Sequence, residues 1–313
     1  LYVEAGDRIV LYDNVTTNGD QSYTTGTLTL SDSITLETLT GNISVNVDQL
    51  HTGNNDTVQS NNGLGNFTIQ TYTSGGTLVL SNVTSSITLS NFANYIFGGS
   101  YEGLGPIDLG FDLSASGNLI FNSPVVLTSS ASTQTITSNN YNITFNATID
   151  DDTSGHHALV VNAGTGSLTL GGAIGNNVPL LSIDFTGAQG LYLNGGAITT
   201  TDSQTYHSPV ILGADTTLNA GNNITFNSTV DSSNTSGLNI YANQVAFYGD
   251  VGAINPLDHL YVTGDYAVID ANITTNGYQT YDTHLWIGNN NYPWYGRTVT
   301  LTSHDDSITF NGP

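Results

Sequence analysis

The chain has 313 residues, a formal net charge of -23 and only two basic side chains, Arg8 and Arg297. It contains no lysine, no cysteine and no methionine. Two arginines cannot neutralise a series of phosphates, which excludes nucleic acid and anionic membrane as partners. The missing cysteine excludes disulfides, zinc ribbons and iron–sulfur clusters.

Short alternating runs follow one another along the chain, with an aliphatic or aromatic residue at every second position. The clearest runs are residues 27–30, 33–36, 77–80, 86–89, 142–145 and 167–170. Period two with threonine on the other face predicts half-buried strands, and the Asn-Gly and Gly-Gly groups between them mark tight turns. Only three of the 25 acidic residues are glutamate, so the charge lies mostly on a turn-forming residue and not on a helix former. The sequence predicts an all-β fold.

One stretch, residues 91–118, fits the alternation poorly. Tyr95, Phe97 and Tyr101 and several glycines interrupt it there. We expect a bulged loop or a small lateral insertion at this place, within a single domain that spans residues 1–313.

Internal repeats distinguish between the possible all-β architectures. Residues 14–23 and 272–281 are identical at seven of ten positions, and Ile-Thr-Phe-Asn occurs at Ile143, Ile224 and Ile308. A third element, glutamine followed two residues later by tyrosine or isoleucine, recurs along the whole chain. It occurs at Gln21, Gln70, Gln134, Gln204 and Gln279.

Together these elements define a degenerate unit of about 75 residues, clearer in residues 130–313 than in 1–130. A unit of this length holds roughly three coils of a β-helix, and its drifting length is easily absorbed by loops at coil corners. The sequence therefore predicts an elongated parallel β-solenoid.

Residues 158–231, which include HALVVNAGTG, GAITTTDSQTY and GADTTLNAGNNITFNSTV, resemble the β-strand repeats of large bacterial surface adhesins. These are filamentous-haemagglutinin-like and autotransporter passenger proteins. The resemblance covers residues 130–313 well and 1–130 more weakly. It implies a right-handed β-solenoid on the outside of a prokaryotic cell, acting as stalk or scaffold and carrying no catalytic residues.

One polar cluster could hold a metal ion. Asp150, Asp151 and Asp152 precede His156 and His157 within eight residues, and carboxylates with imidazoles are ligands for divalent cations. A solvated loop is the simpler interpretation of the same residues. No calcium-loop spacing is present, so we expect no dedicated cofactor and at most diffuse binding of Ca²⁺ by the acidic surface.

Exposed aromatics could form a contact for a glycan or a partner. The densest aromatic group is Trp286, Tyr292, Trp294 and Tyr295, and it contains both tryptophans of the chain. A corner loop that folds its aromatics over the core is the alternative.

Asn-x-Ser/Thr sequons, which permit N-glycosylation, are about as numerous as the composition gives by chance. They lie at Asn14, Asn42, Asn55, Asn66, Asn82, Asn142, Asn146, Asn223, Asn227, Asn234 and Asn272.

We expect no enzyme, but an extracellular structural or adhesive segment that contacts neighbouring repeats or other copies of itself and does not insert into membranes. The alternative is a self-assembling sheath, S-layer or filament subunit that joins through strand edges or chain ends. A carbohydrate-binding or polysaccharide-degrading β-helix ranks third. Because the chain starts at Leu1 and stops within the recurring pattern, we expect a processed product or a segment of a longer protein.

Overall fold

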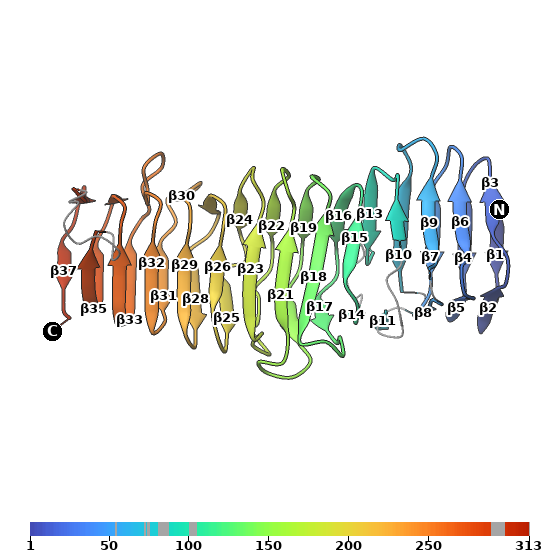
Figure 1. Cartoon of the computed structure of the whole chain (residues 1–313), viewed down its shortest axis with the longest axis horizontal. Coiled ribbons are helices and arrows are strands. Elements are labelled where there is room, and N and C mark those ends of the chain that lie inside the picture. The colour runs from blue at the N-terminus through green and yellow to red at the C-terminus, as the bar shows by residue number, and fades with distance from the viewer. Residues whose placement is uncertain are drawn as a thin grey trace.

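The computed structural model describes residues 1–53, 55–71, 73, 76–80, 88–99, 105–288 and 298–312. These residues form strands and turns without any helix, and the strands wind into a parallel β-solenoid of about 12 turns with about 22 residues per turn. The coils stack side by side into a rod with the two termini at opposite ends (Figure 1). The predicted fold class is confirmed. A search of the described residues for a helix able to cross a membrane finds none.

Each coil contributes a strand to each of three parallel ladders. The first ladder contains β1 (Tyr2–Glu4), β4 (Gln21–Thr24), β7 (Ile43–Asn46), β10 (Asn66–Gln70), β13 (Asn94–Phe97), β16 (Asn118–Phe121), β19 (Ile143–Phe145), β22 (Leu168–Leu170), β24 (Leu191–Leu193), β27 (Val210–Leu212) and β30 (Val230–Ser232). Isolated bridges through Val251 continue it to β34 (Ile273–Thr275) and then to β36 (Leu301–Ser303).

The second ladder begins with β2 (Arg8–Leu11), β5 (Thr27–Leu30), β8 (Gln49–His51), β11 (Leu78–Val79), β14 (Ile107–Leu109), β17 (Val125–Leu127) and β20 (Ile149–Asp151). Bridges through Ile174 connect it to β25 (Ala197–Thr200), β28 (Thr216–Ala220) and β31 (Leu238–Tyr241). It ends with the first halves of β33 (Leu260–Ile269) and β35 (Gln279–Ile287) and with β37 (Ile308–Phe310).

The third ladder contains β3 (Val15–Thr17), β6 (Thr35–Thr38), β9 (Thr57–Ser60), β12 (Thr88–Ser90), β15 (Leu113–Ala115), β18 (Thr133–Ser138), β21 (Ala158–Asn162), β23 (Ser182–Thr186), β26 (Gln204–Tyr206), β29 (Asn223–Phe226) and β32 (Gln244–Phe247). The second halves of β33 and β35 complete it.

The core follows directly from the alternation in the sequence. Inward positions of successive coils stack on one another, so the buried apolar side chains form one contiguous cluster along the rod. Phe97, Phe121 and Phe145 illustrate this stacking, with ring centroids 5.0 and 4.5 Å apart. Burial of such ladders is the main stabilising contribution in a solenoid.

The alternation continues through β13, within the segment 91–118 where we expected a loop or insertion. Nine residues separate β13 from β14, against two between β7 and β8, and a loop or insertion there stays a prediction. Tyr95 and Phe97 are two residues apart in β13, so both point inward, and both are buried. β13 pairs in register with β10 and β16, so the first ladder is continuous here among the described residues. The aromatics are large core residues in a regular strand; residues 100–104 lie outside the described part.

The sequence repeat and the coil have different lengths. Ile-Thr-Phe falls on β19 of the first ladder, on β29 of the third and on β37 of the second. Eleven strand positions separate each copy from the next, when the bridges at Ile174 and Val251 are counted and β33 and β35 fill two positions each. The unit therefore spans three and two-thirds coils, rather than the three expected, and each repeat is rotated by one face.

Candidate functional site

The Gln-x-Tyr element forms a buried corner between two ladders. The Tyr206 hydroxyl donates to Oε1 of Gln204 at 2.9 Å, and Nε2 of Gln204 donates to the carbonyl oxygens of Ile198 and Asn219 at 3.2 and 2.9 Å. Asn219 belongs to the next coil, so one glutamine side chain ties two coils together. Gln21 with Tyr23 and Gln279 with Tyr281 repeat the arrangement. Because the repeat rotates, the three copies lie at three different corners of the rod.

Two further glutamines found from the same pattern behave differently. Gln70 donates to Oδ1 of Asn46 on the outer face at 2.7 Å. Gln134 is buried and donates to the carbonyls of Leu109 and Phe111, but its Oε1 has no hydrogen-bond partner because Ile136 stands where the tyrosine would be. The pattern therefore predicts the buried corner for three of its five copies, Gln21, Gln204 and Gln279.

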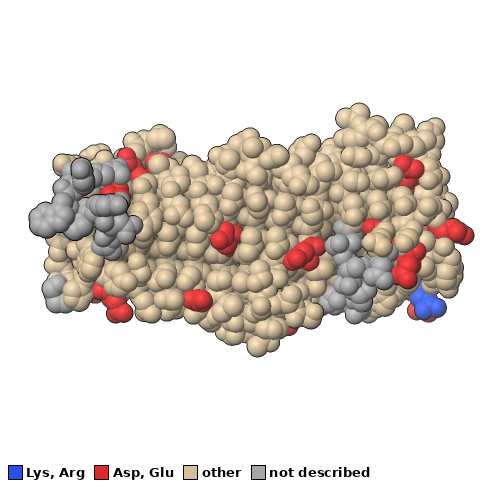
Figure 2. Space-filling view, in the orientation of Figure 1, with Lys and Arg blue, Asp and Glu red and all other residues tan. Residues whose placement is uncertain are grey.

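Aspartates at coil corners accept backbone N–H groups from the neighbouring coil. Asp20 accepts from Asn42 at 2.7 Å, Asp112 from Thr135 at 2.7 Å, and Asp215 from Gly237 at 2.8 Å. This use explains the preference for aspartate, whose short side chain bonds nearby backbone. On the visible face of the rod the acidic side chains are scattered over a mostly uncharged surface (Figure 2).

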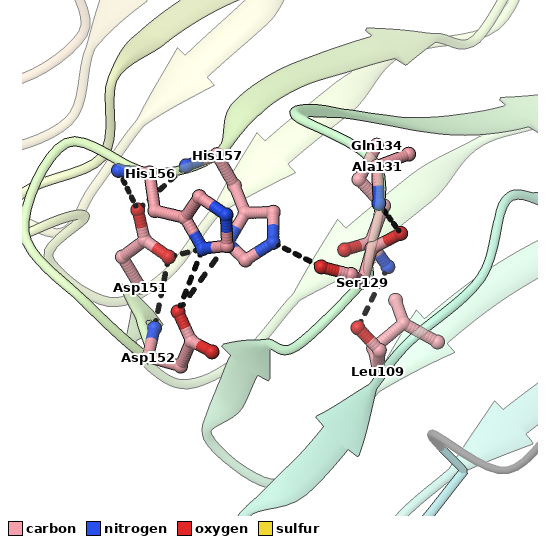
Figure 3. Close-up of polar contacts among 8 residues, drawn as sticks. All are labelled: Leu109, Ser129, Ala131, Gln134, Asp151, Asp152, His156 and His157. Carbon is pink, nitrogen blue, oxygen red and sulfur yellow. Dashed lines mark hydrogen bonds and ion pairs between the residues drawn. The ribbon is translucent and has the colours of Figure 1, made fainter.

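The turn after β20 gathers most of the predicted metal ligands. The Asp151 carboxylate accepts backbone N–H groups from Asp152, His156 and His157 at 2.8–2.9 Å. This holds the turn closed and directs both imidazoles toward the two carboxylates (Figure 3). Nδ1 of each histidine and one oxygen of each of Asp151 and Asp152 lie within 4.8 Å of one another.

His157 is fully buried, and both ring nitrogens face acceptors. Nδ1 lies 2.5 Å from Oδ1 of Asp151, and Nε2 lies 2.6 Å from the carbonyl oxygen of Ser129 in the preceding coil. Burial alone lowers the pKa of His157, but the hydrogen bonds to Asp151 and Ser129 and the charges of Asp151 and Asp152 outweigh it and raise the pKa. Ser129 was not found from the sequence, because its place beside His157 is set by coil stacking.

The other two members of the group face solvent. His156 and Asp152 are 48% and 37% exposed in their side chains, and His156 Nδ1 lies 3.3 Å from Asp152 Oδ1. Partial desolvation alone would raise the pKa of Asp152, but the hydrogen bond with the His156 ring and the nearby charge of His157 outweigh it and lower the pKa. Asp150, the fifth predicted ligand, points elsewhere and accepts the N–H groups of Asn177 and Val178.

Of the predicted aromatic contact residues, only Trp286 is among the described residues. It is 52% exposed on β35, and its ring centroid lies 6.2 Å from that of Tyr266 on β33. Tyr292, Trp294 and Tyr295 lie outside the described part of the chain. A glycan or partner contact at this place stays a prediction.

The sequon asparagines occupy outward corner positions. Asn14, Asn42, Asn55, Asn142, Asn146, Asn227 and Asn234 are exposed, whereas Asn66, Asn223 and Asn272 are half-buried; Asn82 is not among the described residues. Several of them belong to a side-chain ladder. In it Asn42 accepts from the backbone of Asn66, and Asn142 accepts from that of Ser167. Their recurrence has a structural use that does not require glycans.

Comparison of the chain with family models, with curated proteins and with solved structures finds no match.

Proposed function

We propose that this chain is a non-enzymatic scaffold at the surface of a prokaryotic cell, a stalk or spacer segment of an adhesin-like protein. The observation that carries the proposal is the stack of about 12 coils whose described residues share one contiguous core. With strands about 4.8 Å apart, about 12 turns extend roughly 58 Å. A rod of this kind sets a distance and resists bending, which is the task of a stalk.

The use of its polar groups also favours a scaffold. The buried glutamines, tyrosines and many aspartates are bonded to backbone or to one another across coils. Groups engaged in this way hold coils in register and are not free to act on a substrate. The resemblance of residues 158–231 to adhesin repeats supports the extracellular setting.

The test is labelling of intact source cells with an antibody against the purified chain, followed by electron microscopy. We expect label on unpermeabilised cells at a distance from the envelope. Label that appears only after permeabilisation would contradict the surface location, and a compact particle in small-angle scattering would contradict the rod.

A second function, a subunit of a filament that joins end to end, is favoured by the two ends of the described rod. Among the strands of the described residues, β1 pairs with β4 at one end of the rod and β37 pairs with β35 at the other. Tyr2 and Phe310 on these strands are 67% and 55% exposed. Open ladders of this kind accept either a further coil of the same chain or a second copy.

This candidate is tested with the double variant Tyr2→Asp and Phe310→Asp, which places negative charge at both ends. If copies join end to end, polymers of the purified chain disappear in this variant and persist in Tyr192→Asp, a control at an exposed tyrosine in mid-rod. If the unmodified chain forms no polymers at high concentration, the filament function is wrong.

A further inference from the structure

The turn between β20 and β21 contains more carboxylate and imidazole side chains than are needed to close the turn. The equivalent turn of the next repeat follows β30. There the backbone N–H of Ser232 donates to the carbonyl of Asn255 at 3.2 Å, as that of Asp151 donates to Val178 at 3.1 Å. The two turns therefore occupy the same structural position in successive repeats.

The second turn has a serine where the first has Asp151. Oγ of Ser232 accepts the N–H groups of Asn234 and Ser236 at 3.3 and 2.6 Å, the role that the Asp151 carboxylate has in the first turn. That turn reaches its next strand at Leu238 without any histidine. A serine is thus sufficient for the corner, and the two aspartates and two histidines of the first turn need another explanation.

We propose that Asp151, Asp152, His156 and His157 form a binding site for a divalent transition metal ion such as Zn²⁺. Two imidazoles and two carboxylates are a donor set that zinc accepts in tetrahedral geometry. With bonds of about 2.0–2.2 Å, such ligand atoms are about 3.3–3.6 Å apart.

Two of the separations between ligand atoms meet this requirement, and all four atoms lie within 4.8 Å of one another. Oδ1 of Asp152 lies 3.3 Å from Nδ1 of His156 and 3.6 Å from Nδ1 of His157. The 2.5 Å between Nδ1 of His157 and Oδ1 of Asp151 is a hydrogen-bond distance, so the metal must replace that proton and move the two atoms apart by about 1 Å.

The surroundings orient the ligands as metal sites commonly do. Nε2–H of His157 donates to the carbonyl of Ser129, which leaves Nδ1 as the coordinating nitrogen. Backbone N–H groups fix the Asp151 carboxylate. His156 and Asp152 are on the solvent side, so an ion can enter there without unfolding of the turn.

The test measures Zn²⁺ binding to the intact chain by isothermal titration calorimetry in a non-coordinating buffer at neutral pH. We expect one equivalent of tight binding over any weak acidic background, and a weakening of at least about tenfold in His156→Ala and in Asp152→Asn. Both substitutions are at half-exposed side chains, so the chain keeps its fold, which is checked by its thermal transition.

The matched control is His207→Ala. His207 is an exposed histidine paired with Asp184 across neighbouring coils at 3.1 Å, but it has only one carboxylate within reach among the described residues. The control should bind Zn²⁺ like the unmodified chain. Ca²⁺, which prefers oxygen ligands, should show no dependence on His156, and Co²⁺ should give the absorption spectrum of a tetrahedral complex.

The proposal is wrong if the unmodified chain shows no stoichiometric binding, or if His156→Ala and Asp152→Asn bind as tightly as the unmodified chain. If His207→Ala weakens Zn²⁺ binding equally, binding depends on histidines and carboxylates in general and not on the four-residue site. That result would also overturn the proposal. None of these results bears on the scaffold function, which depends on the rod alone.

Discussion

At the scale of single residues, the buried Gln-x-Tyr corner shows what a polar pair must do inside a solenoid. The Tyr206 hydroxyl and the Gln204 amide bond to each other and to the backbone of two coils. A buried polar group left without its partner costs about 1–3 kcal/mol. The corner is therefore stabilising only as a complete set.

Replacing Tyr206 with phenylalanine tests this cost. Tyr206→Phe leaves Oε1 of Gln204 buried without a donor, the state that Oε1 of Gln134 already has, and should reduce the free energy of unfolding by about 1–3 kcal/mol. Tyr266→Phe is the control, because Tyr266 makes the same bond to Gln244 at 2.9 Å while exposed; its effect should stay within about 0.5 kcal/mol. Equal effects in denaturant titrations would show that burial of the pair is unimportant.

The same tyrosines predict loss of stability in alkali. Burial raises the pKa of Tyr23 to about 12 and also raises those of Tyr206 and Tyr281. In the unfolded chain these hydroxyls ionise near pH 10, so ionisation favours unfolding above that pH. The stability that depends on neutral Tyr23 is intact below pH 10 and falls as pH rises toward 12. Tyr23→Phe should flatten this part of the pH dependence, measured by circular dichroism; an unchanged slope would contradict the assignment.

The sequence predicts a contact between polar side chains more easily when the contacting residues are close together in the chain. The turn with Asp151, Asp152, His156 and His157 is local, so the spacing of these residues brings them together in any closed turn. The contacts of His157 with Ser129 and of Gln204 with Asn219 cross from one coil to the next. To predict these two contacts one must know the length of every loop between the contacting residues, and the alternation of apolar residues does not give those lengths.

At the scale of strands and turns, the close approach of the next coil limits which residues can occupy a coil corner. Gly252 has a φ of +67°, and a Cβ there would lie 2.1 Å from the carbonyl oxygen of Thr274 in the next coil. Gly175, its equivalent one repeat earlier, has a φ of +63° and a similar approach to the carbonyl of Thr199. Strand pairing between coils therefore fixes glycine at these corners.

A series of three alanine substitutions separates the cost of a left-handed φ from the cost of a close approach by the next coil. Gly19→Ala, with free space and no left-handed φ, should change stability by no more than about 0.5 kcal/mol. Gly63→Ala has the left-handed φ of +69° with free space and should cost about 1–2 kcal/mol. Gly252→Ala has both constraints and should cost about 3 kcal/mol or more, because backbone must also move. Thermal unfolding of the three variants checks the order.

The fold class was predictable because period-two alternation is a local signal, repeated many times. Tyr95 and Phe97 do not break the alternation as we expected, because their two-residue spacing places both on the inner face of β13. The rotation of the repeat was not foreseen, since a unit length near 75 residues does not reveal how many strands it contains.

At the scale of the whole molecule, each coil contacts only its neighbours, so stability is expected to be local. Phe121→Ala removes the middle ring of the stack with Phe97 and Phe145 and should cost about 3–5 kcal/mol. Hydrogen exchange should accelerate in β13, β16 and β19 while β33 keeps its protection. Uniform loss of protection along the rod would show that the coils unfold as one unit.

Because each repeat is rotated by one face, a group that recurs in every repeat does not always lie on the same side of the rod. A group that occurs once per repeat appears on the first, the third and then the second ladder, as Ile-Thr-Phe does in β19, β29 and β37. Three repeats, or eleven coils, return it to its starting face. A longer array built on this rule would display any once-per-repeat feature along a spiral. A receptor could then meet it from every side without the rod having to turn.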